Sequence, residues 1–437
     1  MGRKHRRRIS RNKMIMFYKK YFRLRYIYTL SIVYCIFLLY KYRIQFLGDT
    51  VSYLAAWDML IDGHIDEWRT PVYPLLLGCF KFFFGSSNYL LYIVLFQYFI
   101  FLISIRYFHR LTIAITKNGI ISFFFTTFYA LFPCIPTWNC YILTESIAIS
   151  CSIFYLYSLL LLYQKNSITH WIITYFWLLF LIFLRPVFIY LLPIIFVGGI
   201  LLFIKKGKSI SKFIVSGLIG YAIVCILLVA YVVSFKNNYG IYSLSGISTI
   251  NKYWIARMAG AVDPMFPYDP NSQRPICKRI VYGEVRKPVD VFYEAEVAIS
   301  SYGLKQFSDY VNYNIKKNRS LYFKRIIRNF IDAANYSLFE TSYTNPSILR
   351  SLRINLLLVY VMFLIYFIVL MKFMINKKTI ALFSCLLYMI GFSHLFVIIV
   401  GSPGDYSRLI LPAIPVYFIM IGQLISYFII KNRKIFI

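Results

Sequence analysis

Acidic side chains are scarce in this chain, so each isolated one is a candidate for chemistry. The 437 residues hold 16 Asp and Glu against 48 Lys and Arg. Glu145 is the only acid between Trp68 and Val262, and Asp405 is the only one after Glu340. A carboxylate beside an apolar segment is expensive to keep, which points to a role, and a carboxylate can abstract a proton as a general base.

A small set of acids and arginines borders the apolar segments of the chain. A guanidinium is planar and permanently charged, which suits it to hold a phosphate, while a neighbouring carboxylate can deprotonate a hydroxyl. Ordinary structural roles are also open. Asp49 could cap a helix, Glu145 could lie in a first turn, and Arg185 could anchor a helix at an interface. The set consists of Asp49, Glu145, Asp405, Arg69, Arg185 and Arg408.

The elements that position this set are predicted to be membrane-spanning helices. Hydrophobic residues make up 60% of the chain, aromatic residues make up 20%, and the mean hydropathy is +0.65. Several uncharged stretches reach the roughly 18 residues that a helix needs to cross a bilayer. They are apolar on all faces rather than alternating, which favours helices over strands. The predicted fold class is an all-α polytopic membrane protein.

Ten crossings are predicted, at 26–46, 88–108, 119–137, 142–163, 170–185, 186–204, 213–235, 352–375, 379–400 and 410–430. With the amino terminus inside, the inner loops are rich in Lys and Arg and free of Asp and Glu, as the positive-inside rule requires. These loops are His109–Asn118, Gln164–His170, Lys205–Lys212 and Asn376–Lys378. The C-terminal segment Lys431–Lys434 also carries Lys and Arg and no Asp or Glu. Both termini are then cytoplasmic, and the isolated acids and arginines face the extracytoplasmic side.

The formal net charge of +32 has a membrane explanation. Eleven Lys and Arg fall within Met1–Arg25, and others lie in short inner loops. Anionic membrane lipids are therefore the expected partner, and nucleic acid is not. Since no small-residue cleavage site follows the first apolar stretch, we expect an uncleaved anchor. The bias towards Ile, Phe, Tyr, Lys and Asn indicates an A+T-rich bacterial genome, so the bacterial inner (cytoplasmic) membrane is the expected location.

Four regions are predicted along the chain: a basic cytoplasmic tail at 1–25, a membrane domain at 26–235, an extracytoplasmic loop region at 236–351, and C-terminal membrane helices at 352–437. The first outer loop, 47–87, should hold two interfacial helices, at 50–62 and 71–85. Trp57 and Leu60 of the first would face lipid, and Gly63 would end it. The 236–351 region should end in a basic amphipathic helix with the stripe Phe323, Ile326, Ile327, Phe330 and Ala334.

Several short motifs resemble those of GT-C class glycosyltransferases, the polyprenyl-phosphate-sugar dependent enzymes related to protein O-mannosyltransferases and the lipid A aminoarabinose transferase. The similarity covers roughly the first 200 residues and the last 40. It rests on Gly48-Asp49-Thr50-Val51-Ser52-Tyr53-Leu54-Ala55-Ala56, Arg69-Thr70-Pro71-Val72-Tyr73-Pro74, Leu143-Thr144-Glu145-Ser146, Leu184-Arg185-Pro186 and Arg408-Leu409-Ile410-Leu411-Pro412. The 236–351 region matches no pattern of this family.

The resemblance implies transfer of a sugar, with inversion, from a polyprenyl-phosphate donor to an acceptor hydroxyl on a glycan, lipid or protein. It implies catalytic roles for Asp49 and Glu145. The implied substrate-binding residues are Tyr53, Arg69, Tyr73, Arg185, Arg408 and Asp405. The chain departs from the pattern at Thr50, where the family usually has a second acid, which argues against a metal requirement. No cofactor is expected.

Two other functions remain open from the sequence. An oligosaccharide polymerase or ligase would also have about ten crossings and an arginine-rich outer loop. A lipid or glycan transporter would favour ionisable groups near the bilayer midplane and often internal repeats, neither of which is visible. No nucleotide-binding loop is present, and the five histidines lack paired ligand spacing. His64 lies near Asp62, Asp66 and Glu67, where a solvated loop is favoured over a divalent-ion site.

Overall fold

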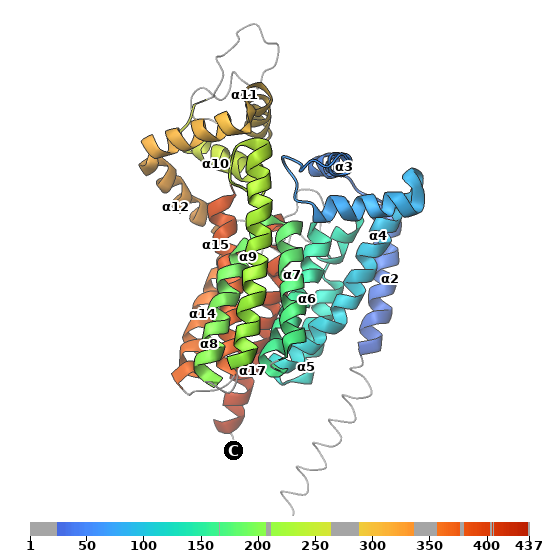
Figure 1. The fold of residues 1–437 in the computed structure, drawn as a ribbon. Coiled ribbons are helices and arrows are strands. Elements are labelled where there is room, and N and C mark those ends of the chain that lie inside the picture. Colours follow the sequence, from blue (N-terminus) through green and yellow to red (C-terminus); the bar gives the residue numbers. More distant parts are fainter. Residues whose placement is uncertain are drawn as a thin grey trace, which may run out of the picture.

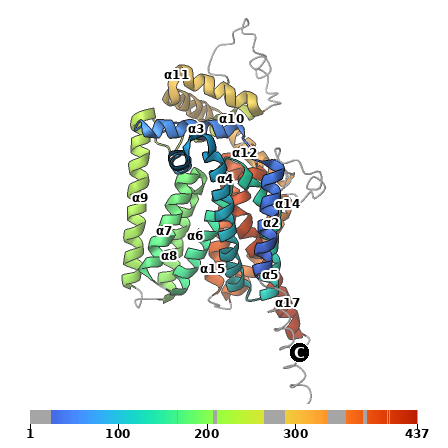
Figure 2. The ribbon, with the colours of Figure 1, turned by 90° about the vertical axis from the view of Figure 1, so that its right-hand side faces the viewer.

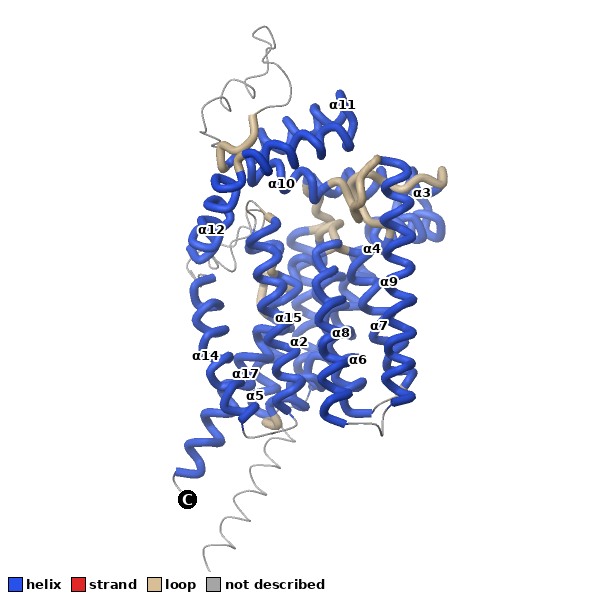
Figure 3. Tube along the Cα trace, turned by 60° about the vertical axis from the view of Figure 1, so that its left-hand side comes forward, coloured by secondary structure: helices blue, strands red, loops and turns tan. Residues whose placement is uncertain are grey.

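A computed structural model describes residues 24–165, 167–206, 211–263, 288–335, 356–375, 380–402, 404 and 406–435. Within these ranges the chain consists of helices joined by loops, and no strand is present (Figure 3). The long helices run side by side as a bundle, while α3 (Gly48–Ile61), α10 (Ile247–Met258), α11 (Pro288–Lys317) and α12 (Arg319–Asn335) lie at one end of it (Figure 1). We call this the site end.

Seven segments in the described part of the chain are long and apolar enough to cross a membrane. They are Leu24–Tyr42 (α2), Val72–Thr116 (α4), Gly119–Cys140 (α5, Gly119–Leu131, with η1, Pro136–Cys140), Glu145–Lys165 (α6), Val215–Tyr239 (within α9, Ser211–Tyr239), Leu382–Gly401 (within α15, Ile380–Gly401) and Leu411–Ile429 (η5, Leu411–Ala413, and most of α17, Ile414–Ile435). The predicted class, a helical polytopic membrane protein, is confirmed at this level.

Three further apolar helices are shorter. They are Ile168–Leu184 (α7), Pro186–Leu201 (η2, Pro186–Tyr190, and most of α8, Leu191–Lys206) and Leu356–Lys372 (within α14, Leu356–Ile375). Each of the ten predicted crossings overlaps one of these helices or the seven longer segments. The number of crossings, and the side of the membrane that each end faces, stay predictions. α17 reaches the end of the bundle opposite to α3 (Figures 1 and 2).

Helix α4 contains a sharp corner that separates two roles. Gly85 has φ 74°, a backbone conformation that glycine adopts at low cost, and the helix changes direction there. The arm before the corner lies across the site end, and the arm after it runs down the bundle (Figure 1). The first arm corresponds to the helix predicted at 71–85, and the second contains the crossing predicted at 88–108.

Helix α3 packs on the first arm of α4. An added Cβ on Gly78 would lie about 2.0 Å from the Trp57 indole, so this indole covers the bare glycine backbone. The prediction that Trp57 faces lipid is therefore wrong, because its apolar face is used for packing between helices. Gly63 (φ 79°) follows the helix and its N–H bonds to the Leu60 carbonyl, as predicted for a C-terminal stop.

The helices that follow α9 at the site end have a core of their own. Its buried members include Ile250, Tyr253, Ala295 and Phe307, and Arg257 pairs with Glu294 inside it at 3.4 Å. Helix α12 divides the stripe predicted for it. Phe330 packs towards the bundle, while Phe323 and Ile327 are 63% and 50% exposed. The predicted stripe does lie on one face of α12, because its residues are spaced by three or four along the helix, but only part of that face packs against the bundle.

Helix α6 is the most enclosed of the seven long segments. In its most apolar stretch of 18 residues 83% of the residues are buried, whereas the corresponding value for Val215–Tyr239 is 17%. It packs between α4 and α7, and its first residue is Glu145. The centre of the bundle at the site end is thus a helix amino terminus that carries a carboxylate.

Candidate active site

A short backbone bridge brings the two carboxylate-bearing segments together. Gln45 and Tyr141 form an isolated parallel bridge, in which the Gln45 N–H donates to the Cys140 carbonyl at 2.9 Å and the Ile142 N–H donates to the Gln45 carbonyl at 3.1 Å. The Thr50 hydroxyl adds a bond of 3.2 Å to the Ile142 carbonyl. Asp49 and Glu145 each follow this bridge by four residues, so the bridge holds them at a similar height along the bundle axis.

Five charged side chains from separate segments form a continuous chain of contacts. Arg69 donates to Asp49 Oδ1 at 2.8 Å, and Arg408 donates to Asp49 Oδ2 at 2.5 Å. Arg408 also donates through Nε to Glu145 Oε1 at 2.5 Å, and Arg185 lies 3.3 Å from that same oxygen. We call the set Arg69, Asp49, Arg408, Glu145 and Arg185 the carboxylate–arginine chain. Arg408 is its central bridge.

Access to the carboxylate–arginine chain is uneven. The Glu145 side chain is 0% exposed, the three arginines are 11–14% exposed, and Asp49 is 29% exposed. Glu145 Oε2 is buried and has no hydrogen-bond partner among the described residues. The chain carries three cations and two anions, so it has a surplus of one positive charge. The three guanidiniums could hold an anionic group, and Asp49 is the most exposed member of the set.

Electrostatics keep Asp49 ionised. Its burial alone would raise the pKa of the carboxyl, but the charges and hydrogen bonds of Arg408 and Arg69 outweigh burial and hold the pKa well below its ordinary value. A carboxylate with such a low pKa is a weak base, so Asp49 can accept a proton only after it has lost arginine contacts. Asp49 is the second residue of α3, whose N-cap is Leu47, so the interpretation of Asp49 as an N-cap is wrong.

Groups outside the carboxylate–arginine chain hold Arg69 in place. Its Nε donates to the Ser52 hydroxyl at 2.7 Å, and its guanidinium lies 4.4 Å from the centre of the Tyr53 ring. Its backbone N–H donates to Asp66 at 2.6 Å. The predicted contact residue Tyr53 therefore supports Arg69, and Ser52 and Asp66 are site residues that the sequence analysis missed. Asp66 stands three residues before Arg69, the spacing of a side-chain-capped turn.

Tyr73 stands behind Tyr53 rather than in the carboxylate–arginine chain. It is fully buried, its ring meets Tyr53 edge to face at 5.1 Å, and its hydroxyl donates to Gln97 at 3.3 Å. Gln97 in turn donates to the carbonyls of Asn139 and Tyr141, both at 2.9 Å. The prediction for Tyr73 as a substrate contact stays untested. Gln97 was missed, although an amide inside a predicted crossing is a usable signal.

The predicted site residues thus fall into three groups. Asp49, Glu145, Arg69, Arg185 and Arg408 contact one another, and Tyr53 and Tyr73 lie behind Arg69. Asp405 lies outside the described residues. No three His, Cys, Asp or Glu in the described part of the chain lie together as a metal site would require.

The helices after α9 attach to the segment that leads into Arg69. The Gly246 N–H donates to the Glu67 carbonyl at 2.7 Å, and the Tyr239 hydroxyl donates to the Ile65 carbonyl at 2.5 Å. Burial, together with the neighbouring Asp66, raises the pKa of the Glu67 carboxyl to about 7. The 236–351 region, which matched no motif, therefore has a contact role at the site end.

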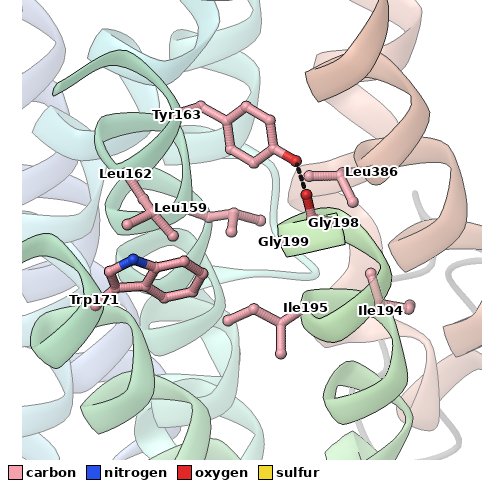
Figure 4. A pocket seen from close by; sticks show the side chains of 9 residues that line it. All are labelled: Leu159, Leu162, Tyr163, Trp171, Ile194, Ile195, Gly198, Gly199 and Leu386. Carbon is pink, nitrogen blue, oxygen red and sulfur yellow. Dashed lines mark hydrogen bonds between the residues drawn. The ribbon is translucent and has the colours of Figure 1, made fainter. Parts of the chain in front are cut away.

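A narrow crevice lies elsewhere in the bundle, between α6, α7, α8 and α15 (Figure 4). Its lining is apolar except for Tyr163, whose hydroxyl donates to the Gly198 carbonyl at 2.8 Å. Because a helix rises about 1.5 Å per residue, Tyr163 lies roughly 27 Å along α6 from Glu145. The crevice lining has no charged side chain, and its Tyr163 hydroxyl is already bonded to Gly198, so the carboxylate–arginine chain is the candidate active site.

No protein-family model matches the chain, and no curated protein matches its sequence. The site itself is therefore the guide to function: a carboxylate that can become a base once freed lies beside three arginines suited to phosphate, at one end of an apolar bundle.

Proposed function

We propose that this protein transfers a sugar from a polyprenyl-phosphate donor to an acceptor hydroxyl at the site end of the bundle. The observation that carries the proposal is the bridging of Asp49 and Glu145 by Arg408, with Arg69 and Arg185 at the two ends. A lipid-linked sugar phosphate would insert its chain beside the bundle and place its phosphate where these arginines gather.

The reaction begins with an exchange of anions. The donor phosphate takes the guanidinium contacts that Asp49 holds at 2.8 and 2.5 Å in the resting site. Asp49 then loses the two charges that depress its pKa, and its basicity rises. The acceptor oxygen attacks the anomeric carbon as its proton passes to Asp49. The bond from that carbon to the phosphate oxygen breaks, and the electron pair leaves on the phosphate, where the arginines stabilise it.

The position of the charged groups favours this function over transport. Glu145 opens α6 and Arg185 follows α7, so both lie at helix ends, whereas a transporter places ionisable groups near the midplane. An oligosaccharide polymerase or ligase would use the same phosphate chemistry, and only the identity of the donor distinguishes it. Reconstituted vesicles that report sugar transfer and lipid movement separately would discriminate a transferase from a transporter.

The test uses full-length protein in lipid nanodiscs with polyprenyl-phosphate hexose and pentose donors. Asp49→Asn should reduce release of polyprenyl phosphate by about a hundred- to ten-thousand-fold, the usual contribution of a general base. The same variant should bind farnesyl phosphate at least as tightly as wild type, because Asp49 competes with phosphate for the arginines. Asp58→Asn on the same helix, a surface residue paired with Lys81, is the matched control and should be silent.

The arginine arm of the test compares two substitutions. Arg69→Lys keeps the charge but loses the planar fork, so turnover should fall partially, and Arg69→Ala should fall further with weaker donor binding. Wild-type turnover in both Asp49→Asn and Arg69→Ala would overturn the proposal. Protein recovery and a monodisperse elution profile must be checked for each variant, because Asn can satisfy only one of the two guanidiniums that Asp49 serves.

A further inference from the structure

His394 on α15 connects the two segments that present Arg185 and Arg408. The ring is fully buried. Its Nδ1 lies 3.0 Å from the Tyr190 hydroxyl, and its Nε2 lies 3.1 Å from the Leu409 carbonyl oxygen. Tyr190 ends η2, which begins directly after Arg185, and Leu409 ends the four-residue helix α16 (Tyr406–Leu409) that carries Arg408.

The two bonds define which tautomer the neutral ring adopts. A backbone carbonyl can only accept, so Nε2 carries the proton and donates to Leu409. In a neutral imidazole Nδ1 is then the acceptor, and the Tyr190 hydroxyl is its donor. Both ring nitrogens are therefore satisfied by the two arginine-bearing segments.

The two arginine-bearing segments need a further contact to hold them at a fixed distance from each other. Arg408 and Arg185 converge on one oxygen of Glu145, at 2.5 and 3.3 Å, although their like charges repel each other. Neither arginine lies inside a long helix, since Arg185 falls between α7 and η2 and Arg408 belongs to α16. A bond network that ends one residue after Arg408 and five residues after Arg185 limits how far apart they can move.

We infer that His394 is a positioning residue, which sets the spacing between Arg408 and Arg185 and thereby the affinity of the site for phosphate. The inference rests on the proposed function, in which these arginines hold the donor phosphate. Histidine suits the task because one rigid ring offers a donor and an acceptor on different edges, so a displacement of either segment breaks a bond. A His394 that only filled the core would affect stability and leave phosphate binding unchanged.

The experiment measures equilibrium binding of farnesyl phosphate to the full-length protein in nanodiscs, with farnesol as the probe that lacks phosphate. Tyr190→Phe removes one hydroxyl, and His394→Gln places an amide N–H towards Leu409 while losing the acceptor for Tyr190. Each should weaken farnesyl phosphate binding about five- to tenfold, the value of one buried hydrogen bond, and leave farnesol binding unchanged. The double variant should be no weaker than either single one, because both break the same bond.

Tyr417→Phe is the matched control. Its buried hydroxyl also donates to α15, but at the Gly391 carbonyl rather than at His394, so phosphate binding should stay at the wild-type value. Wild-type affinity in Tyr190→Phe and His394→Gln, with weaker binding in Arg408→Gln, overturns the inference and leaves the proposed function standing. Wild-type affinity in Arg408→Gln overturns the proposed function instead. If His394→Gln does not fold, the comparison of Tyr190→Phe with Tyr417→Phe decides alone.

Discussion

The bridge between Arg408 and Glu145 can be tested without any substrate, by a double-mutant cycle. Arg408→Gln leaves two arginines and two carboxylates, and Glu145→Gln leaves three arginines around one carboxylate. Glu145 is fully buried and Arg408 is 14% exposed, so solvent screens their interaction little. Each single substitution should therefore destabilise the protein by about 3–5 kcal/mol, the cost of leaving a buried charge without its partner.

The double variant should cost less than the sum of the two single ones. With Glu145→Gln and Arg408→Gln combined, Arg69 still pairs with Asp49 at 2.8 Å, and the repulsion between Arg408 and Arg185 is removed. A coupling energy of about 1–3 kcal/mol is expected for two groups in direct contact. Lys81→Gln with Asp58→Asn provides the control cycle. That pair, at 3.5 Å, is 39% and 67% exposed, and its coupling should stay below about 1 kcal/mol.

The assay is equilibrium unfolding of the purified full-length protein in mixed micelles, titrated with sodium dodecyl sulfate and followed by tryptophan fluorescence. If the free energies of destabilisation of Arg408→Gln and Glu145→Gln sum to that of the double variant within about 0.5 kcal/mol, the two residues do not interact. That result would remove the bridge on which the candidate site depends. A large coupling in the Lys81 control cycle would mean that the method measures a general response to charge loss rather than a buried contact.

Two further predictions concern pH and topology. The pKa of Glu67 is raised to about 7 from an ordinary value of 4.5, so between these pH values the folded chain keeps a proton that the unfolded chain releases. The stabilisation that the protonated carboxyl gives is therefore complete below about pH 4.5 and is lost as the pH rises through 7. Glu67→Gln should therefore flatten the fall in melting temperature between pH 5 and 8, and an unchanged slope would contradict the burial of this carboxyl. In a chain without native exposed cysteines, Tyr313→Cys at the site end should react with an impermeant maleimide added outside cells and Lys117→Cys should not. The reverse pattern would invert the predicted topology.

The residues of the candidate site could be predicted from the sequence, because hydropathy indicates how deep in the membrane each residue lies. A charge that borders an apolar segment must lie near its end, so the boundaries at Asp49, Glu145, Arg185 and Arg408 placed these residues on one face of the membrane. Their pairing was not open to prediction. The contact between Arg408 and Glu145 depends on α6 and α17 being neighbours, which is decided by packing among all the apolar helices.

The apolar face of a helix could also be predicted, but the surface that it packs against could not. The helical wheel of residues 50–62 placed Trp57 on an apolar face, but lipid and a neighbouring helix are equally apolar, so the wheel could not choose between them. The bare backbone of Gly78 decides the matter in favour of packing. His394 was likewise visible in a predicted crossing, but its partners Tyr190 and Leu409, which are distant in sequence or lie beyond a helix end, could not be predicted.

Solvent access separates the roles of the two carboxylates that the resemblance joined. Asp49 is 29% exposed and faces the approach to the arginines, so an acceptor hydroxyl can reach it, whereas Glu145 is fully enclosed behind Arg408. In the proposed reaction Glu145 would therefore act through Arg408, whose guanidinium it contacts. Glu145→Gln should weaken farnesyl phosphate binding, while Asp49→Asn should preserve or strengthen it and remove turnover. If Glu145→Gln removes turnover with phosphate binding intact while Asp49→Asn keeps turnover, the base is Glu145, and the acceptor must enter from a direction that the resting site closes.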